Sequence, residues 1–538
     1  MAKRIENSSI EPVSMPRVNW RTFMRGPESV LAGQLVGLEC LTASDDRAVA
    51  LARAFVLAKH GQASEARKQL ETIRKDQYAA GCADSDSQFT LVDGHVRVYE
   101  DQPFVKGTKE LLNRILESSR PDDLVGQALA LNLLCIHALH MGHFDRAQEY
   151  AEGAIRCYRQ GDAVFGSLHL HAHLGQIKLM RGDLDGAASQ YAEMQERLDR
   201  LPDDTSALLA ICRTLRSEVA YETNDLVQSS TLLAHAMGSV EEEDAWLDVR
   251  AAAYRVRTRL AYIRSGLPGA LTELAHCEKV AEARKMPRLL RLMKIERIRA
   301  LTLSNEIGAA RRIMREIDLT FEAYDWDTGQ DWALRQGTAG VAIARWLVRA
   351  RRSRDALAFV DPAEDFAIRG GQLLTLAKLR IIRAAAHWRL NQKTDATAAL
   401  LSALRLLGRQ PFRRFILDEG NEIAQVVQAA LDGERVIVAP LPEQRRKLSE
   451  LTYYWATHQT GGPAALFHDR SQGRHGRANG RQRYLELVAL GHSNKEIAQI
   501  LGVSVDTVKY HLKKLFNDLD ATNRMQAVRR GQELGIIR

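Results

Sequence analysis

The clearest alternation of apolar and polar side chains in this chain lies between residues 505 and 519. At about 100° per residue, one face collects Val505, Val508, Leu512, Leu515, Phe516 and Leu519. The adjacent face collects Asp506, Lys509, Tyr510, Lys513 and Asn517. This pattern predicts a helix that packs by one face and presents a polar, basic face to its surroundings.

A second helix is predicted directly before the first. Ser493 and Glu496 have the S-x-x-E spacing of a capping box, which starts a helix at Asn494. Gly502 allows the chain to turn, and Ser504 is a candidate N-cap for the next helix. The sequence therefore predicts a helix, a tight turn and a helix. Such a unit is suited to the DNA major groove when the free face of its second helix is basic.

A different pattern, a repeat, fills most of the remaining chain. Turns of Gly, Asn or Asp type, such as the one that starts at Gly142, are each followed by a small residue. These small residues are Ala66, Ala147, Ala187, Ser229, Ala270, Ala310, Ala356 and Ala396. The first interval is about twice as long as each of the others, so we expect a diverged copy near residues 102–109. A nearly fixed period of this kind predicts stacked helix pairs, with a small residue where the two helices approach closely.

Composition supports a helical protein. The chain is 45% hydrophobic but only 6% aromatic, and it contains 13 Pro in 538 residues. We therefore expect an all-α fold: a helical-repeat superhelix followed by a four-helix domain. The predicted domains are an N-terminal arm (1–30), about nine helix pairs (31–432), a partly helical and then Gly-rich, basic linker (433–479), and the C-terminal domain (480–538).

The positive charge is concentrated in the C-terminal part. Residues 481–538 hold ten Lys and Arg against six Asp and Glu, within a chain whose net charge is +8. This distribution is what phosphate binding requires. The six scattered cysteines, the polar N-terminus and the lack of an apolar run of membrane-spanning length lead us to expect a cytoplasmic protein with no membrane partner.

The C-terminal segment resembles the LuxR-type helix-turn-helix. The resemblance is carried by Ser493 to Ala498, Leu501 to Ser504, Thr507 to Leu512, and Arg524 with Ala527 and Val528. It implies base contacts by Lys509, Tyr510 and Lys513, and phosphate contacts by Lys495, Thr507, His511 and Lys514. It also implies a dimer contact through the last helix, by Met525 and Val528; the alternative is that the few apolar residues of this helix only close the core of the domain. The sequence departs from the family at the front, where residues 477–481 replace Leu-Thr-x-x-Glu.

The repeats resemble tetratricopeptide repeats, and their longer period is similar to the sensor domain of MalT-like regulators, which also carry a LuxR-type head. The fragment Ala147 to Ala154, with small residues at i, i+4 and i+7, carries this resemblance. The family normally has an ATPase module. Because no G-x-x-x-x-G-K-[ST] motif occurs in this sequence, we expect neither a nucleotide switch nor any other cofactor.

Two groups of residues outside the C-terminal domain (480–538), which we call the head, are candidates for sensing. His137, His140, His169 and His173 lie within two neighbouring repeats, and Arg288 and Arg291 lie in a basic stretch. The histidines either form a ligand- or pH-sensing patch or are satisfied inside a polar helix layer. The basic stretch either binds an anionic inducer or acidic partner or is a solvated face. We expect no metal site, because no carboxylate or thiolate completes a ligand set.

We therefore expect a sequence-specific, DNA-binding transcriptional regulator, an activator, and not an enzyme. Its predicted partners are double-stranded DNA, RNA polymerase, an inducer or protein bound by the repeats, and a second copy on DNA. The alternative is a protein-interaction scaffold whose helix-turn-helix no longer reads specific DNA. Enrichment of one palindromic DNA motif in a genome-wide pull-down would favour the regulator, and salt-sensitive binding without sequence preference would favour the scaffold.

Overall fold

The computed structural model describes residues 19–25, 47–79, 87–201, 205–243, 245–322, 324, 326, 338–433, 439–460, 480–489, 492–501, 505–519, 521 and 523–533. Most of the predicted N-terminal arm and the Gly-rich part of the predicted linker lie outside these residues, as do Gly502 and Ser504. Within them the chain forms helices and no β-strand, so the predicted all-α class is confirmed. None of the described helices is long and apolar enough to cross a membrane.

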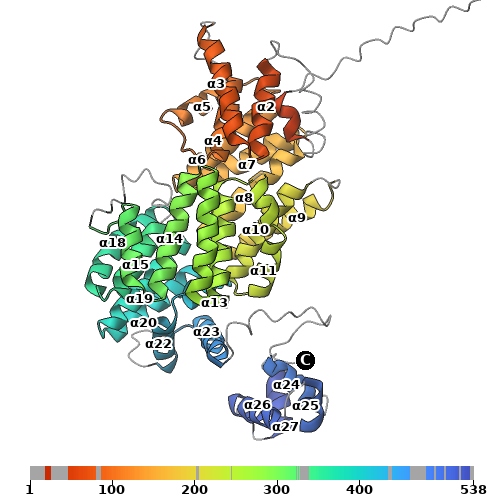
Figure 1. Cartoon of the computed structure of the whole chain (residues 1–538). Coiled ribbons are helices and arrows are strands. Elements are labelled where there is room, and N and C mark those ends of the chain that lie inside the picture. Colours follow the sequence, from red (N-terminus) through yellow and green to blue (C-terminus); the bar gives the residue numbers. More distant parts are fainter. Residues whose placement is uncertain are drawn as a thin grey trace, which may run out of the picture. The chain divides into compact units, whose positions relative to one another are not determined.

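The chain divides into two compact units, at residues 1–467 and 468–538. Figure 1 shows the first unit as consecutive helix pairs, from the red α2 through the green α13 to the blue α22. The part of the chain that the structure describes holds nine such pairs. They are α2 (Arg47–Lys59) with α3 (Ala63–Ala79), α4 (Ser87–Tyr99) with α5 (Thr108–Ser118), α6 (Leu124–His140) with α7 (Phe144–Gln160), α8 (Val164–Met180) with α9 (Leu184–Leu198), α10 (Ser206–Glu222) with α11 (Leu226–Ala234), the two halves of α13 (Leu247–Ala283), α14 (Pro287–Leu303) with α15 (Ile307–Glu316), α17 (Thr338–Arg349) with α18 (Ser353–Arg369), and α19 (Leu373–Arg389) with α20 (Lys393–Leu407).

Shorter elements flank the pairs. A 3-10 helix, η1 (Trp20–Met24), packs against α2, and α12 (Met237–Glu242) follows α11. After the ninth pair come α21 (Arg414–Leu417), α22 (Asn421–Asp432) and α23 (Pro442–Thr460). The helix α23 lies in the stretch predicted as a partly helical linker, and its Leu448 and Leu451 are fully buried in the core of the first unit.

A positive φ recurs at the turn inside every described pair. One residue per turn has a φ between 58° and 75°, namely Gly61, Asp101, Gly142, Gly182, Asn224, Gly266, Asn305, Arg351 and Asn391. Gly, and to a lesser extent Asn and Asp, adopts a positive φ most easily, and Arg351 is the exception in this set. Gly266 shows the consequence within α13, where φ 64° and ψ −156° separate two helices that otherwise run on continuously. Asp101 is the turn residue of the second pair, where the sequence predicts a diverged copy.

The small residues predicted to close each turn are all inaccessible to solvent. Ala66, Ala147, Ala187, Ser229, Ala270, Ala310, Ala356 and Ala396 are each 0% exposed. They lie in the second helix of their pair, where it approaches the first. A larger side chain at this point would have to push the two helices apart, because a packed interior contains little free volume.

The pairs wind far enough that repeats about five apart contact each other. Asp101, in the second turn, is fully buried and accepts hydrogen bonds from the backbone N–H groups of Arg288 and Leu289 at the start of α14, at 2.8 and 3.1 Å. Further along the chain, the backbone N–H of Arg413 donates to the carbonyl of Glu222, at 2.8 Å. The superhelix therefore closes on itself between segments that are far apart in the sequence.

The second unit contains four helices: α24 (Gly480–Ala489), α25 (Asn494–Leu501), α26 (Val505–Asp518) and α27 (Arg524–Glu533). They enclose a small core of their own. Its buried members are Leu485, Leu487, Val488, Ile497, Ala498, Val508, Leu512, Leu515, Leu519, Ala521 and Ala527. The predicted helix-turn-helix is α25 followed by α26, so the fold class predicted for this domain is confirmed.

Candidate DNA-binding surface and central cavity

The helix α25 begins with the predicted capping box. The backbone N–H of Ser493 donates to Oε2 of Glu496 at 2.7 Å, and the backbone N–H of Glu496 donates to Oγ of Ser493 at 3.3 Å. These hydrogen bonds, the backbone one foremost, hold the pKa of the exposed Glu496 carboxyl below its usual value. Two donors that the helix leaves unsatisfied are thus paired reciprocally, which fixes where α25 begins.

The side chain of Arg524 joins α27 to the start of α25. Its Nη1 donates to the carbonyl of His492 at 2.7 Å, and its Nη2 contacts Oδ1 of Asn494. The backbone N–H of Gln526 donates to Oδ1 of Asn523, at 2.9 Å, which caps α27. The last helix therefore stabilises the entry to the helix-turn-helix.

The helix α26 presents the two faces that its sequence predicts. Val508, Leu512, Leu515 and Leu519 are buried, and Phe516 packs partly against them. Lys509 and Lys513 are exposed on another face. One member of the predicted apolar face differs: Val505 is 37% exposed, because it lies in the first turn of α26, at the edge of the core.

Other predicted residues of the head lie on α25 and α27. Lys495 is exposed in the first turn of α25, and Met525, at 83% exposure, lies beside the half-buried Val528 on α27. The side chains of Thr507, Tyr510, His511 and Lys514 lie outside the described part of α26. The contacts of Lys509, Tyr510, Lys513 and the phosphate-binding set with DNA therefore stay predictions.

The four predicted histidines of the repeats fall into sets with different immediate partners. The rings of His169 and His173 lie against Trp246, with centroids 5.9 and 5.0 Å away, and both side chains are buried. Nε2 of His140 lies 3.2 Å from Oδ2 of Asp248, and His137 packs edge-on against Phe104. No group of three His, Cys, Asp or Glu side chains in the described residues is arranged to hold a metal ion.

The basic stretch of α14 makes contacts inside its own pair and to two other pairs. Nε of Arg288 donates to Oδ1 of the buried Asp101, five pairs earlier, at 2.6 Å. Nη1 of Arg291 donates to the carbonyl of Ile317 at the end of α15, in the same pair, at 2.6 Å. Nε of Arg297 donates to a carboxylate oxygen of Glu278, in the preceding pair, at 2.8 Å. Arg288 and Arg297 therefore join different pairs, and Arg291 joins the two helices of its own pair.

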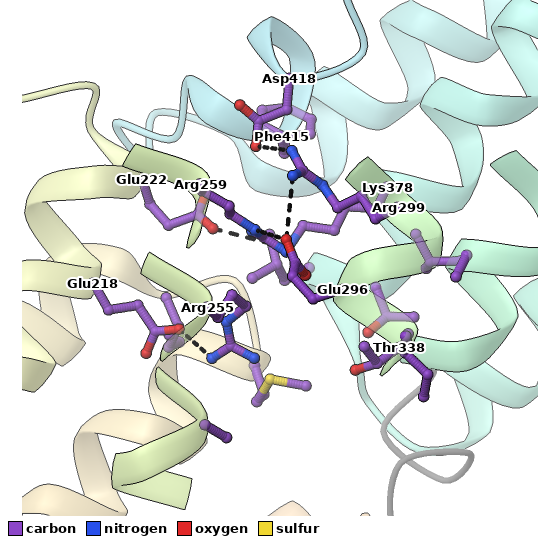
Figure 2. A pocket seen from close by; sticks show the side chains of 18 of the residues that line it. Glu218, Glu222, Arg255, Arg259, Glu296, Arg299, Thr338, Lys378, Phe415 and Asp418 are labelled. Carbon is purple, nitrogen blue, oxygen red and sulfur yellow. Dashed lines mark hydrogen bonds and ion pairs between the residues drawn. The ribbon is translucent and has the colours of Figure 1, made fainter. Parts of the chain in front are cut away.

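The central cavity of the first unit, to which the first helices of the pairs contribute, was not anticipated from the sequence. It has a volume of about 120 Å³, which is far more than one water needs, and its walls come from the first helix of seven consecutive pairs and from α21. Most of its polar lining is charged, as Figure 2 shows. The charged side chains are Glu218, Glu222, Asp248, Glu296, Asp418 and Glu419 with Arg255, Arg259, Arg299, Arg345 and Lys378.

Most of these charges are paired at close range. Arg259 donates from Nε and Nη2 to the two oxygens of Glu296, at 2.7 and 3.0 Å, and Arg299 joins Glu296 to Asp418, at 3.2 and 2.8 Å (Figure 2). Burial acts to raise the pKa of Glu296, but Arg259 and Arg299 hold it at about 2. Burial likewise opposes ionisation of Asp418, yet Arg414 and Arg299 keep its pKa well below the usual value. These groups are therefore charged at neutral pH.

A signal for this cavity was present in the sequence but is readable only with hindsight. Arg259 and Arg299 are separated by one repeat period, although both of their helices carry several other charged residues. A charge that recurs at the repeat period places its side chains at equivalent positions of successive pairs. The partners of these charges come from other repeats, which the period alone does not identify.

Comparisons with known proteins agree with both units. Residues 95–432 match the family model of the MalT-like TPR region, and residues 482–530 match that of bacterial regulatory proteins of the luxR family. The HTH-type transcriptional regulator AlkS of Alcanivorax borkumensis is 47% identical over 53 residues, which is 10% of this chain and 6% of that protein. The HTH-type transcriptional regulator MalT of Serratia proteamaculans is 23% identical over 203 residues, which is 36% of this chain and 22% of that protein. The chain thus spans less than a quarter of the length of either relative.

A solved structure has a similar fold. The structure of a Rap protein complexed with Competence and Sporulation Factor aligns with a TM-score of 0.50 and 12% sequence identity, over 68% of this chain and 98% of that one. At this identity the likeness concerns the fold alone.

Proposed function

Because the chain belongs to the family with a MalT-like TPR region and also carries a luxR-family regulatory domain, we propose that it is a transcriptional regulator that binds specific DNA sequences. The observation that supports this most directly is α26, which packs into its domain by one face and exposes Lys509 and Lys513 on another. A helix of this kind can enter the major groove while its apolar face remains in the core.

We assign base contacts to Lys509, Tyr510 and Lys513 and phosphate contacts to Lys495, Thr507, His511 and Lys514. Lysine donates to the O6 and N7 acceptors of guanine, and the Tyr510 ring packs on a thymine methyl group or donates its hydroxyl. The exposure of Lys495 in the first turn of α25 supports its assignment to backbone phosphates, and phosphate contacts fix the register of the head on the duplex.

The test begins with selection of genomic fragments by the full chain, followed by binding measurements on the enriched site. Lys509→Ala and Lys513→Ala are expected to weaken specific binding by about 1–3 kcal/mol and to relax the base preference. Lys495→Ala is the matched control: it is expected to weaken specific and non-specific binding alike and to lower the salt dependence by about one phosphate contact. Unchanged affinity and selectivity in both recognition-helix variants would refute the assignment.

Pairing of two heads on DNA is proposed through α27, where Met525 is exposed beside Val528. The operator is then expected to have two-fold symmetry. A charged substitution, Met525→Glu, should leave binding to a half-site unchanged and abolish cooperative binding to the full site. Equal cooperativity in the variant and the natural protein would exclude this contact.

Control of the head is proposed to come from the repeats, which receive a small molecule or a protein and lead the head to activate transcription, with contacts to RNA polymerase. Support comes from the cavity of the first unit and its charged lining. The assay is transcription in vitro from the selected promoter, with and without an effector. A protein-interaction scaffold would instead bind DNA with no sequence preference and leave transcription unchanged.

A further inference from the structure

The central cavity has two charged side chains that its own ion pairs leave incompletely bonded. Nζ of Lys378, on α19, lies 3.8 Å from Oε1 of Glu222, on α10, which is beyond hydrogen-bond distance (Figure 2). Oε2 of Glu222 is buried and has no hydrogen-bond partner among the described residues. The amide oxygen of Gln176, which also lines the cavity, is likewise buried without one.

The arginines of the cavity are engaged in a different way. Arg259 is held by two hydrogen bonds to Glu296, and Arg345 is held by Glu419. A ligand that bound either guanidinium would have to leave the opposing carboxylate buried and uncompensated, which is costly. Lys378 can accept a new partner without this penalty, since burial already lowers its pKa and Glu222 only partly offsets the effect.

The charge balance of the lining restricts the ligand further. Six carboxylates face five cationic side chains of the lining, while Arg414 contacts one of the six, Asp418, from outside the lining and His140 contacts another, Asp248. An added net charge in this enclosure would be poorly solvated. An anion alone would also be repelled by Glu222, and a cation alone by Lys378. A ligand with one positive and one negative charge can pair with both Glu222 and Lys378 and leaves the net charge of the cavity unchanged.

We propose that the cavity binds a small zwitterion of the amino-acid or short-peptide class, with its carboxylate on Lys378 and its ammonium on Glu222 and Gln176. Apolar side chains, including Leu179, Met180 and Phe415, line the same cavity and accommodate an apolar ligand side chain. This inference rests on the proposed sensing function and names its ligand.

The location of the two residues gives the ligand a mechanical effect. Glu222 ends α10 in the fifth pair, and its carbonyl accepts from the N–H of Arg413, across the closure of the superhelix. Lys378 lies on α19 in the ninth pair. A zwitterion bonded to both side chains therefore joins successive turns of the superhelix. Because it can make both contacts only when these turns lie together, its binding stabilises that arrangement.

The test uses the full chain, with thermal unfolding and calorimetric titration against the twenty standard amino acids and a set of apolar dipeptides. At least one zwitterion is expected to raise Tm. If leucine is the ligand, 4-methylpentanoate lacks only the amine and 3-methylbutylamine lacks only the carboxylate, and neither should bind. Lys378→Met and Glu222→Gln are each expected to weaken binding about tenfold or more, whereas Lys393→Met, on the outer helix α20, should not.

The outcomes separate this inference from the proposed function. Failure of every zwitterion to bind, or undiminished binding in folded Lys378→Met and Glu222→Gln proteins, would overturn the inference. Should either variant unfold, Lys378→Arg and Glu222→Asp keep the charges and test the geometry by a change in affinity. Binding of the selected DNA is measured on the same samples. Its loss in the natural protein would refute the proposed function, whereas intact DNA binding without ligand binding would refute only the cavity assignment.

Discussion

Removing one partner of the Arg345–Glu419 pair is expected to destabilise the repeats more than removing both. Arg345 on α17 donates from Nε to the two oxygens of Glu419, at 3.1 and 2.9 Å, and from Nη2 to Oε1, at 2.5 Å. The two side chains are only 8% and 9% exposed. Burial opposes ionisation of Glu419, but the facing Arg345 keeps its pKa below the usual value. The pair is therefore charged and almost free of water.

The magnitude follows from what each substitution leaves behind. Arg345→Met leaves the buried Glu419 carboxylate without its partner, at a cost of about 3–5 kcal/mol. Replacing both residues with Met removes two buried charges at similar side-chain volume, so the free energy of unfolding should return to within about 1 kcal/mol of the natural value. In a domain of roughly 400 residues the single change corresponds to a fall in Tm of about 4 °C or more.

The assay is thermal unfolding of the full chain, with hydrogen exchange on α17, α21 and α22, because repeat arrays can unfold in parts. Arg409→Met is the matched control. It breaks an arginine–glutamate pair with Glu443 that is largely exposed, so Tm should not change measurably. A double variant as unstable as the sum of its single variants would refute the reasoning, since the charges would then contribute independently.

Three further predictions test packing and protonation. A Cβ on Gly175 would overlap the ring of Tyr191, so Gly175→Ala should destabilise the fourth pair by about 1–3 kcal/mol. Gly308 lies in open space on a helix, so Gly308→Ala is the control and should be neutral or slightly stabilising. Thermal melts measure both changes. Burial lowers the pKa of His173 to about 4, so the unfolded chain binds this proton first as the pH falls. Between pH 7 and pH 5 the contribution of His173 to stability should therefore fall by about 2 kcal/mol, and His173→Phe should remove that part of the pH dependence in thermal melts. Asp101→Ala should lower the free energy of unfolding by about 3–5 kcal/mol and remove hydrogen-exchange protection at the start of α14. Unchanged protection there would show that the Asp101 carboxylate does not hold the first N–H groups of α14.

Local patterns were sufficient to predict the helical elements. The small residues at the repeat period mark where two helices must touch, and Ala147 and Ala187 are indeed inaccessible. The apolar spacing of α26 and the capping box of α25 depend on contacts within one or two helical turns. Such contacts are encoded by neighbours in the sequence. The one apolar residue of α26 placed wrongly, Val505, lies at a helix end, where periodicity cannot tell whether the core extends that far.

The sites outside the head could not be predicted in the same way. The histidines were singled out for their spacing, yet His169 and His173 pack on Trp246, which lies two helix pairs further along the chain. Lys378 and Glu222 carried no signal at all, because each is one charged residue in a helix that has several. Their significance depends on which other helix faces them.

The sequence by itself determined that this chain is a series of helix pairs followed by a helix with one apolar and one basic face, because period, turn residues and amphipathicity are local properties. Only the tertiary structure decided that pairs about five apart meet, and that charged residues of five first helices surround one cavity. The physical reason is that the rotation from one repeat to the next is small and accumulates. A small rotation at each pair, set by side-chain packing and not by the repeat pattern, determines whether Glu222 and Lys378 end far apart or 3.8 Å from each other.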